Sequence, residues 1–162
     1  MIRLERLTAG HAGALLAFER VNREWFARSV PDRGDAFFAG FAARHRALLA
    51  EQDAGVCHFH VVLDERDELV GRCNLVDVAD GAAELGYRVA ESAAGRGVAT
   101  AAVAEVCRLA VTAYGLRTLN AVASLDNAAS RAVLAHSGFT AVAEVTVNGR
   151  PAMRYRRPLT AT

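Results

Sequence analysis

The segment from Cys57 to Tyr114 constrains the fold most, because it predicts three consecutive strands followed directly by one long helix. Strands are expected at 57–63, 69–78 and 83–89, separated by the charged segment DERDE and an Ala-Asp-Gly turn. Connections this short join antiparallel neighbours. The helix expected at about 98–114 is a crossover to a further strand. The pattern therefore favours a mixed, mostly antiparallel sheet over a doubly wound parallel one.

The remaining elements extend this sheet and cover both of its faces. RLERL at 3–7 predicts a first strand, and two helices are expected, from Thr8 to about Asn22 and from Asp35 onward. After the crossover helix come a strand at TLNAVAS, a helix at NAASRAVLAHSG and a hairpin that turns at Asn148-Gly149. The expected order is β-α-α-β-β-β-α-β-α-β-β. We predict one α/β (α+β) domain over residues 1–162, with helices on both faces of the central sheet.

Composition excludes several classes of function. The formal net charge of +1 at pH 7 gives no broad electrostatic reason to expect nucleic acid or an anionic membrane as a partner. All 19 Lys and Arg residues are Arg, which excludes a phosphate-binding P-loop and Schiff-base chemistry, since both need Lys. Three widely spaced cysteines favour reduced thiols in a cytoplasmic protein. The longest apolar run falls well short of the roughly 20 residues that span a membrane.

Three histidines raise the question of a metal site. His58 and His60 share one face of a strand, but no cysteine or carboxylate stands at a suitable spacing to complete a set of ligands. A partly exposed sheet face is the favoured interpretation for this pair. His45 falls on the apolar stripe of its helix and is interpreted as a core residue. We therefore expect no metal.

The junction between the third strand and the long helix, residues 90–97, predicts an anion site. The first N–H groups of a helix have no partner within it, and the helix dipole places partial positive charge there. Gly95 and Gly97 lack a Cβ, so a bulky anion can approach the backbone, while Arg96 adds a charge and Thr100 a hydroxyl. A plain strand-to-helix turn is the alternative, because two glycines alone form a weak motif. A dinucleotide-binding crossover is rejected, since its third glycine and its later acidic residue are absent.

Two blocks of sequence carry a family resemblance. ELGYRVAESAAGRGVATAAVAEVCRLA resembles the acetyl-CoA-binding motif of the GNAT acyltransferase superfamily, in which a strand with an acidic residue runs into Gln/Arg-x-x-Gly-x-Gly/Ala. Ala94, Gly97 and Ala99 occupy the three specified positions. LDNAASRAVLAHSGF resembles the later motif of the family. Ser130 in this block and the segment RVNREWF look like the branch that acetylates the N-termini of ribosomal proteins. The resemblance covers nearly the whole chain and implies the GNAT fold.

The resemblance also implies an activity and a cofactor site. It implies an enzyme that transfers an acetyl group from acetyl-CoA, as cosubstrate, to a primary amine. The backbone of the third strand is expected to hold the pantetheine arm, and the helix start the diphosphate. The residues expected to bind the cofactor are Tyr87, Arg88, Val89, Gly95, Arg96, Gly97, Val98, Ala99, Thr100, Asn127 and Ser130.

Two positions depart from the family pattern. Ala94 stands where the family prefers Gln or Arg, so one side-chain contribution to the phosphate site is missing, and weaker cofactor binding is expected. Leu134 stands where many members carry a tyrosine that protonates the leaving thiolate. The branch often lacks this tyrosine, and the general acid stays open.

Glu84 is the expected general base, because the family places an acid in this strand. The alternative is a surface carboxylate paired with Arg72 or Arg88. Ser130 is the second catalytic candidate, as a hydrogen-bond partner of the cofactor sulfur that relays a proton. Its alternative role is to cap its helix beside Asn127.

Trp25 and Phe26 are expected to contact the acceptor, since in this branch the segment between the first two helices lines the acceptor groove; packing is the alternative for Trp25. An α-amino group titrates near about 8 and a lysine amine near about 10.4, so more of the α-amine is neutral at cytoplasmic pH. We therefore favour a protein or peptide N-terminus, such as that of a ribosomal protein. The alternatives are a small amine (an antibiotic, a polyamine or an amino acid) and a non-catalytic module that senses acyl-CoA. The oligomeric state, a homodimer included, stays open.

Overall fold

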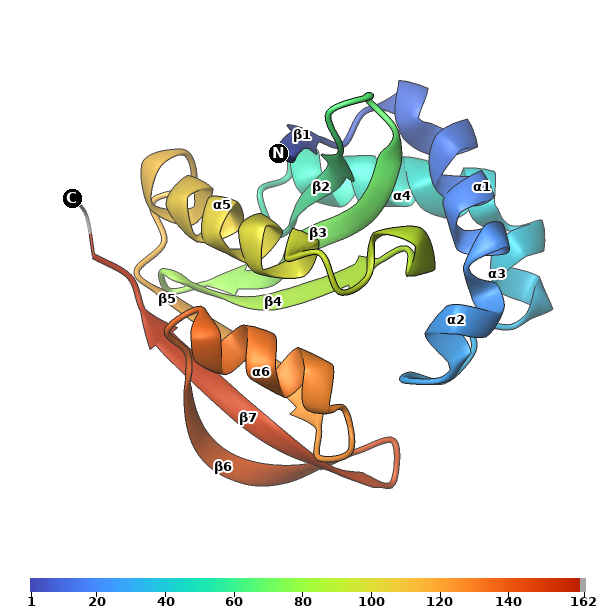
Figure 1. The fold of residues 1–162 in the computed structure, drawn as a ribbon. Helices are drawn as coiled ribbons and strands as arrows, with labels where there is room; N and C mark the ends of the chain where they lie inside the picture. The colour runs from blue at the N-terminus through green and yellow to red at the C-terminus, as the bar shows by residue number, and fades with distance from the viewer. Residues whose placement is uncertain (161–162) are drawn as a thin grey trace.

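The computed structural model describes residues 1–160, whose seven strands form a single sheet (Figure 1). The strand order is β1-β2-β3-β4-β5-β7-β6, and β4 and β5 are the parallel neighbours in an otherwise antiparallel sheet. This confirms the expected mixed sheet; residues 161 and 162 of the predicted domain lie outside the described part. The strands are β1 Arg3–Arg6, β2 His58–Leu63, β3 Leu69–Ala79, β4 Ala82–Val89, β5 Thr118–Ser124, β6 Thr140–Val147 and β7 Arg150–Pro158.

The first helix expected before β2 ends at Asn22 as predicted and is followed by a further short helix, whereas the second expected helix is divided. The Asn22 side-chain amide donates to the Phe18 carbonyl, and its Oδ1 accepts from the Glu91 N–H. Such local side-chain bonds compete with the helical pattern. The second breaks at Gly40. The helices are α1 Ala12–Val21, α2 Arg23–Ala27, α3 Asp35–Ala39, α4 Phe41–Asp53, α5 Val98–Thr112 and α6 Ala128–His136, with short 3-10 turns η1 Ala9–His11 and η2 Glu91–Ala93.

Each face of the sheet has its own apolar core. On one face α5 and α6 pack on the central strands, with Val103, Val106 and Leu134 buried against Leu75 and Leu119. On the other face α1, α2 and α4 cover mainly β2, and Leu15, Phe18 and Phe41 lie in that core. Figure 1 shows α1 to α4 grouped at the β1–β3 side of the sheet, and α6 lying over the β5–β7 side. The expected covering of both faces is confirmed.

The parallel pairing of β4 and β5 is short. It runs from Ala82 opposite Thr118 to Glu84 opposite Asn120, three residue pairs in all. β4 continues to Val89 along β3, and β5 continues to Ser124 along β7. Beyond Glu84, therefore, the facing edges of β4 and β5 are not joined by a ladder, and their backbone groups are left for other partners.

The histidine pair is buried, which corrects the expected partly exposed face. His58 and His60 are 9% and 2% exposed. Tyr114, just beyond α5, covers them: its ring stacks on His58 at 3.7 Å between centroids, and its hydroxyl lies 2.6 Å from His60 Nε2. Burial lowers the pKa of His60 to about 4. His45 is 4% exposed, as a core residue should be.

The three cysteines are free and buried. Among residues 1–160, no group of three or more His, Cys, Asp and Glu side chains is arranged to hold a metal ion. In the same residues, none of the helices has the length and apolar character needed to cross a membrane.

Glu19 is the buried acid that ties α1 to the sheet. Its side chain is 1% exposed, and its carboxylate lies 3.2 Å from Arg72 Nη1, 3.1 Å from Arg88 Nη1 and 3.4 Å from Arg33 Nε. Burial lowers the pKa of Arg88 to about 10 and also lowers that of Arg72. The Glu19 carboxylate thus contacts three guanidinium groups, and its single negative charge does not neutralise their three positive charges.

We expect Glu19→Gln to lower the free energy of unfolding by about 3 kcal/mol, because it leaves buried guanidinium groups without a counter-charge. Urea denaturation followed by circular dichroism measures this change. Glu24→Gln, at an exposed position of α2, is the matched control and should stay within about 0.5 kcal/mol of the wild type. Equal stability of the two variants would contradict the structural role of Glu19.

Candidate active site

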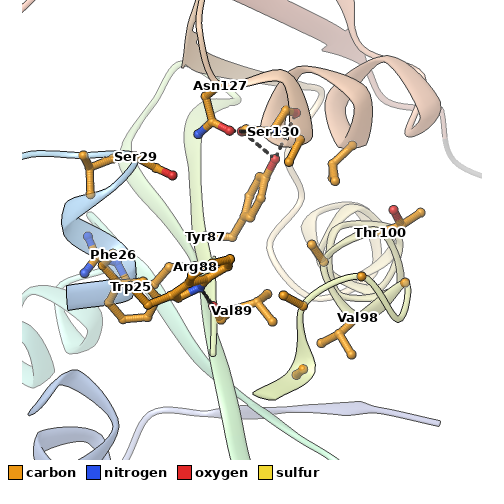
Figure 2. A pocket seen from close by; sticks show the side chains of 18 residues that line it. Trp25, Phe26, Ser29, Tyr87, Arg88, Val89, Val98, Thr100, Asn127 and Ser130 are labelled. Atoms are coloured by element: carbon orange, nitrogen blue, oxygen red, sulfur yellow. Dashed lines mark hydrogen bonds between the residues drawn. The ribbon is translucent and has the colours of Figure 1, made fainter. Parts of the chain in front are cut away.

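A cavity of about 350 Å³ lies where the C-terminal end of β4 meets the starts of α5 and α6 (Figure 2). It brings together residues that the sequence predicted from four separate segments. Figure 2 shows the side chain of Tyr87 reaching from β4 toward Ser130, with Trp25 and Phe26 on the opposite side. The predicted residues that line it are Trp25, Phe26, Tyr87, Arg88, Val89, Gly95, Gly97, Val98, Ala99, Thr100, Asn127 and Ser130.

The start of α5 forms one wall of this cavity. Gly97 is the N-cap, has φ of +75°, and no side chain caps the helix. The first N–H groups of α5 therefore have no partner within the helix, and the helix dipole adds positive potential at the same place. A Cβ built on Gly97 would meet no atom within 4 Å. This open approach to unpaired N–H groups is suited to a phosphate group.

Two arginines contribute less side-chain charge to the cavity than the sequence suggested. Arg96 is exposed and absent from the cavity lining, and its guanidinium donates to the Ser92 carbonyl. The guanidinium of Arg88 contacts Glu19 and lies over the Phe26 ring, 4.4 Å from its centroid. Main-chain groups at the start of α5 thus provide most of the anion-binding character.

A second cavity, of about 260 Å³, lies between the unpaired ends of β4 and β5. Leu85 and Gly86 line it from β4, and residues 121–124 line it from β5. Arg150 is the charged residue among those that line it. Five residues line both this cavity and the first, so the two spaces meet at the gap in the sheet: Ser29, Val30, Tyr87, Asn127 and Ser130.

The Tyr87 side chain stands at this meeting point. Its hydroxyl lies 3.0 Å from Ser130 Oγ and donates to the Ser130 carbonyl at 3.3 Å. Asn127 caps α6 by accepting from the Ser130 N–H at 3.1 Å. Burial raises the pKa of the Tyr87 phenol, so the hydroxyl stays protonated at neutral pH. Sequence reasoning assigned only the backbone of Tyr87; its place on the same strand face as Leu85 was the available signal.

The predicted acceptor residues lie on the β4 side of the first cavity. Trp25 Nε1 donates to the Val89 carbonyl at 3.2 Å, which fixes α2 against the end of β4. Phe26 is 8% exposed and packs on Phe18 in the core. The loop that follows α2 belongs to the segment expected to line the acceptor groove, and its residues Ser29 and Val30, which were not singled out from the sequence, line both cavities.

Glu84 lies outside the lining of both cavities. It accepts from Arg154 Nη2 at 2.7 Å, and its side chain is 29% exposed. Side chains alternate along β4, so Glu84 lies on the same face as Gly86. Gly86 lines the second cavity, and a Cβ built on it would meet no atom within 4 Å. Glu84, the predicted base, therefore belongs to the last residue pair between β4 and β5 before the gap. Its ion-pair partner is Arg154 rather than Arg72 or Arg88.

Comparison with known proteins identifies the class of protein. Residues 2–140 match the family described as acetyltransferase (GNAT) domain, and the chain belongs to this family. The expected enzyme class, an acetyl-CoA-dependent acetyltransferase, is confirmed at this level. A curated relative, the uncharacterized N-acetyltransferase p20 from Bacillus licheniformis, is 31% identical over 74 residues, which are 44% of this chain and 42% of the relative.

Solved structures share the fold over nearly the whole chain. RimJ from Mycobacterium smegmatis, in complex with CoA-disulfide, is 26% identical and has a TM-score of 0.86; the match covers 97% of this chain and 81% of that one. A ribosomal-protein-S5-alanine acetyltransferase from Vibrio fischeri is 21% identical and has a TM-score of 0.89; the match covers 97% of this chain and 92% of that one. Spermidine N-acetyltransferase from Vibrio cholerae and the microcin C7 self-immunity acetyltransferase MccE also have this fold, at 15% and 16% identity. The fold alone therefore does not select the acceptor.

We expect Gly97→Ala to weaken acetyl-CoA binding by about tenfold, since a Cβ would project into the open approach to the α5 N–H groups. Ala at this positive φ also costs about 1–2 kcal/mol of stability. Gly115→Ala is the matched control, because Gly115 has φ of +63° and an open Cβ direction beyond the other end of α5. Calorimetry with acetyl-CoA measures both affinities. The same loss in both variants, or in neither, would place the phosphates elsewhere.

Proposed function

We propose that this enzyme acetylates the N-terminal α-amine of a protein or peptide, with a ribosomal protein as the leading candidate. Acetyl-CoA would lie in the first cavity with its diphosphate at the start of α5 and its pantetheine arm along Tyr87–Val89. The observation that carries the proposal is the meeting of the two cavities at the gap between β4 and β5. There a thioester from one side can meet an amine from the other. Such acceptors are made in the cytoplasm, where we expect the enzyme to act.

Glu84 is the proposed base. The amine nitrogen forms a bond to the thioester carbonyl carbon, the C–S bond breaks, and the nitrogen must lose one proton. Glu84 shares its strand face with the open Gly86, so it can take this proton through a water bound over Gly86. Arg154 holds the carboxylate in place at 2.7 Å. N–H groups at the unpaired β4 edge, near Val89, would stabilise the developing oxyanion.

Tyr87 and Ser130 together are the proposed source of the proton for the departing thiolate. Leu134 is fully buried in the core, so the usual position of the family's tyrosine is occupied by a packing residue. Tyr87 reaches the gap from the neighbouring strand instead, and its hydroxyl contacts Ser130 Oγ. A serine hydroxyl is too weak an acid to protonate the thiolate by itself. A phenol is a far stronger acid, so Tyr87 can supply the proton directly or through Ser130.

The charge of the acceptor side favours a peptide over a polyamine. Arg150 lines the second cavity, whereas Arg154 nearby on β7 is already paired with Glu84. A polycationic acceptor would be repelled by Arg150, whereas an N-terminus presents one amine on a largely uncharged chain. The likeness to RimJ at 26% identity supports the same choice. A small uncharged or anionic amine is the second candidate.

The first test measures free thiol release from acetyl-CoA with a panel of N-terminal peptides and small amines. We expect turnover on peptides, and at least about a 100-fold lower kcat in Glu84→Gln, which also loses the rise of rate with pH that deprotonation of the base gives. Glu144→Gln, at an exposed β6 position, should keep wild-type kcat. Turnover only on small amines overturns the acceptor, acetyl-CoA binding without turnover indicates a sensor, and full activity of Glu84→Gln excludes this base.

A second variant tests the general acid. Tyr87→Phe should keep the fold and lower kcat by about 100-fold, at the lower end of general-acid effects, with little change in acetyl-CoA affinity. Tyr114→Phe removes a partly buried hydroxyl outside both cavities and should leave kcat unchanged. Steady-state kinetics with a thioester whose leaving thiol is more acidic provides a further check. Such a thiolate needs less help from a general acid, so the loss of kcat in Tyr87→Phe should be smaller with this substrate. An equal kcat for both variants would exclude Tyr87.

A further inference from the structure

A third cavity, of about 140 Å³, lies between the sheet and helices α3 and α4. Three guanidinium groups line it, those of Arg33, Arg44 and Arg72, together with His45 and Asn74. Among residues 1–160 no carboxylate lines it. The other lining residues are Phe37, Phe41, Leu48, Phe59 and Val76.

The positive charges of this cavity are poorly compensated. Arg72 is 7% exposed and contacts Glu19 through Nη1, and no other hydrogen bond of its guanidinium occurs within the described chain. Arg33 reaches the same carboxylate at 3.4 Å, and the exposed side chain of Arg44 has neither an ion pair nor a hydrogen bond to any described residue. Burial lowers the pKa of Arg72, and the charges of Arg33 and Arg44 lower it further. Two of the three guanidinium groups thus share one carboxylate, that of Glu19, and the cavity between the three can accept an anion.

His45 gives a second and independent indication of a missing polar group. Its Nε2 donates to the Thr8 carbonyl at 2.9 Å, and the ring stacks on Phe41. Nδ1 is buried and has no hydrogen-bond partner among residues 1–160. Buried polar atoms in native proteins nearly always have a partner, so a ligand with both acceptor and donor capacity, or one that binds with a water, fits here.

The cavity lies beside the proposed path of the acceptor. Asn74 and Val76 of β3 line it, and their partners across the ladder are Gly86 and Glu84 of β4. Adjacent strands are about 4.8 Å apart, so the cavity is roughly one strand away from the proposed base. The loop between α2 and α3 connects the two regions, because Pro31 lines the acceptor cavity and Arg33 lines this one.

We propose that this arginine cavity binds a carboxylate of the acceptor, and that the enzyme therefore selects amines with an acidic group a short distance from the nitrogen. For a peptide, the acidic side chain would be at the second, third or fourth residue, given about 3.3 Å of advance per extended residue. This specificity rests on the proposed N-terminal acetylation. The anion site itself does not, since it follows from the three guanidinium groups, while His45 Nδ1 would accept from a water bound with the anion.

Paired peptides test the specificity. Amidated hexapeptides with N-terminal alanine carry either Asp or Asn at one of the three positions, so that one side-chain carboxylate is the only change. We expect kcat/KM to be about 10- to 100-fold higher for the Asp member of the best pair, as a charge-assisted hydrogen bond gives. Arg44→Gln should remove most of this preference. Arg46→Gln is the matched control on the exposed side of α4 and should retain it.

Thermal denaturation tests the anion site without turnover. With CoA present at saturation to occupy the cofactor phosphate site, sodium phosphate is compared with sodium chloride at equal ionic strength. Phosphate should raise the melting temperature of the wild type and of Arg46→Gln, and not that of Arg44→Gln. Arg44 is chosen because it is exposed and has no partner to lose, so its replacement should not unfold the protein.

The outcomes separate the two proposals. Peptide turnover without any preference for Asp, together with equal phosphate stabilisation of Arg44→Gln and wild type, would overturn the arginine site and leave N-terminal acetylation standing. Absence of peptide turnover, with phosphate stabilisation that depends on Arg44, would overturn the proposed acceptor and support the anion site. An Asp preference that survives in Arg44→Gln would also overturn the assignment to this cavity.

Discussion

β4 and β5 are joined by a ladder over three residue pairs, and the arrangement of the candidate active site depends on where this ladder stops. Past Glu84 and Asn120 the two edges have no strand partner, yet each strand stays fixed by its other neighbour, β3 or β7. The result is a gap through a rigid sheet, lined by backbone groups that need partners. The first cavity opens on the α5 and α6 side of this gap, and the second lies within it. A continuous ladder would have separated the two cavities.

The second organising feature is the excess of buried positive charge on the opposite face. Glu19 compensates part of it, and its contacts draw α1, the α2–α3 loop and two strands together. The remaining guanidinium groups of Arg33, Arg44 and Arg72 keep free donor capacity in a small cavity. Such an arrangement is costly for stability alone, since apolar residues of similar volume would serve packing as well or better. A ligand that brings its own negative charge accounts for its presence.

Much of the fold could be predicted from the sequence, as could most of the residues that line the first cavity, and the failures have physical causes. The strand TLNAVAS and the helix start at Val98 are found at the predicted residues, because periodicity and glycine placement are local signals. The burial of His58 and His60 was not predicted, since it depends on Tyr114, more than 50 residues away. The Arg96 side chain turns away from the cavity, and Arg88 is bound to Glu19, because long side chains follow tertiary partners that no local pattern shows. The role of the Tyr87 side chain and the arginine cavity needed the strand register.

The arginine-only composition has a consequence for how this enzyme responds to acidity. A guanidinium keeps its proton throughout the physiological range, and even Arg88, with its pKa lowered to about 10, stays cationic at neutrality. The electrostatic field of the acceptor side is therefore constant between mildly acidic and mildly basic solution. A change of rate with pH would then come from the groups proposed to exchange protons in the reaction and not from the arginines. In a groove rich in lysine, amines with lowered pKa values would have added their own titration to the pH dependence of the rate.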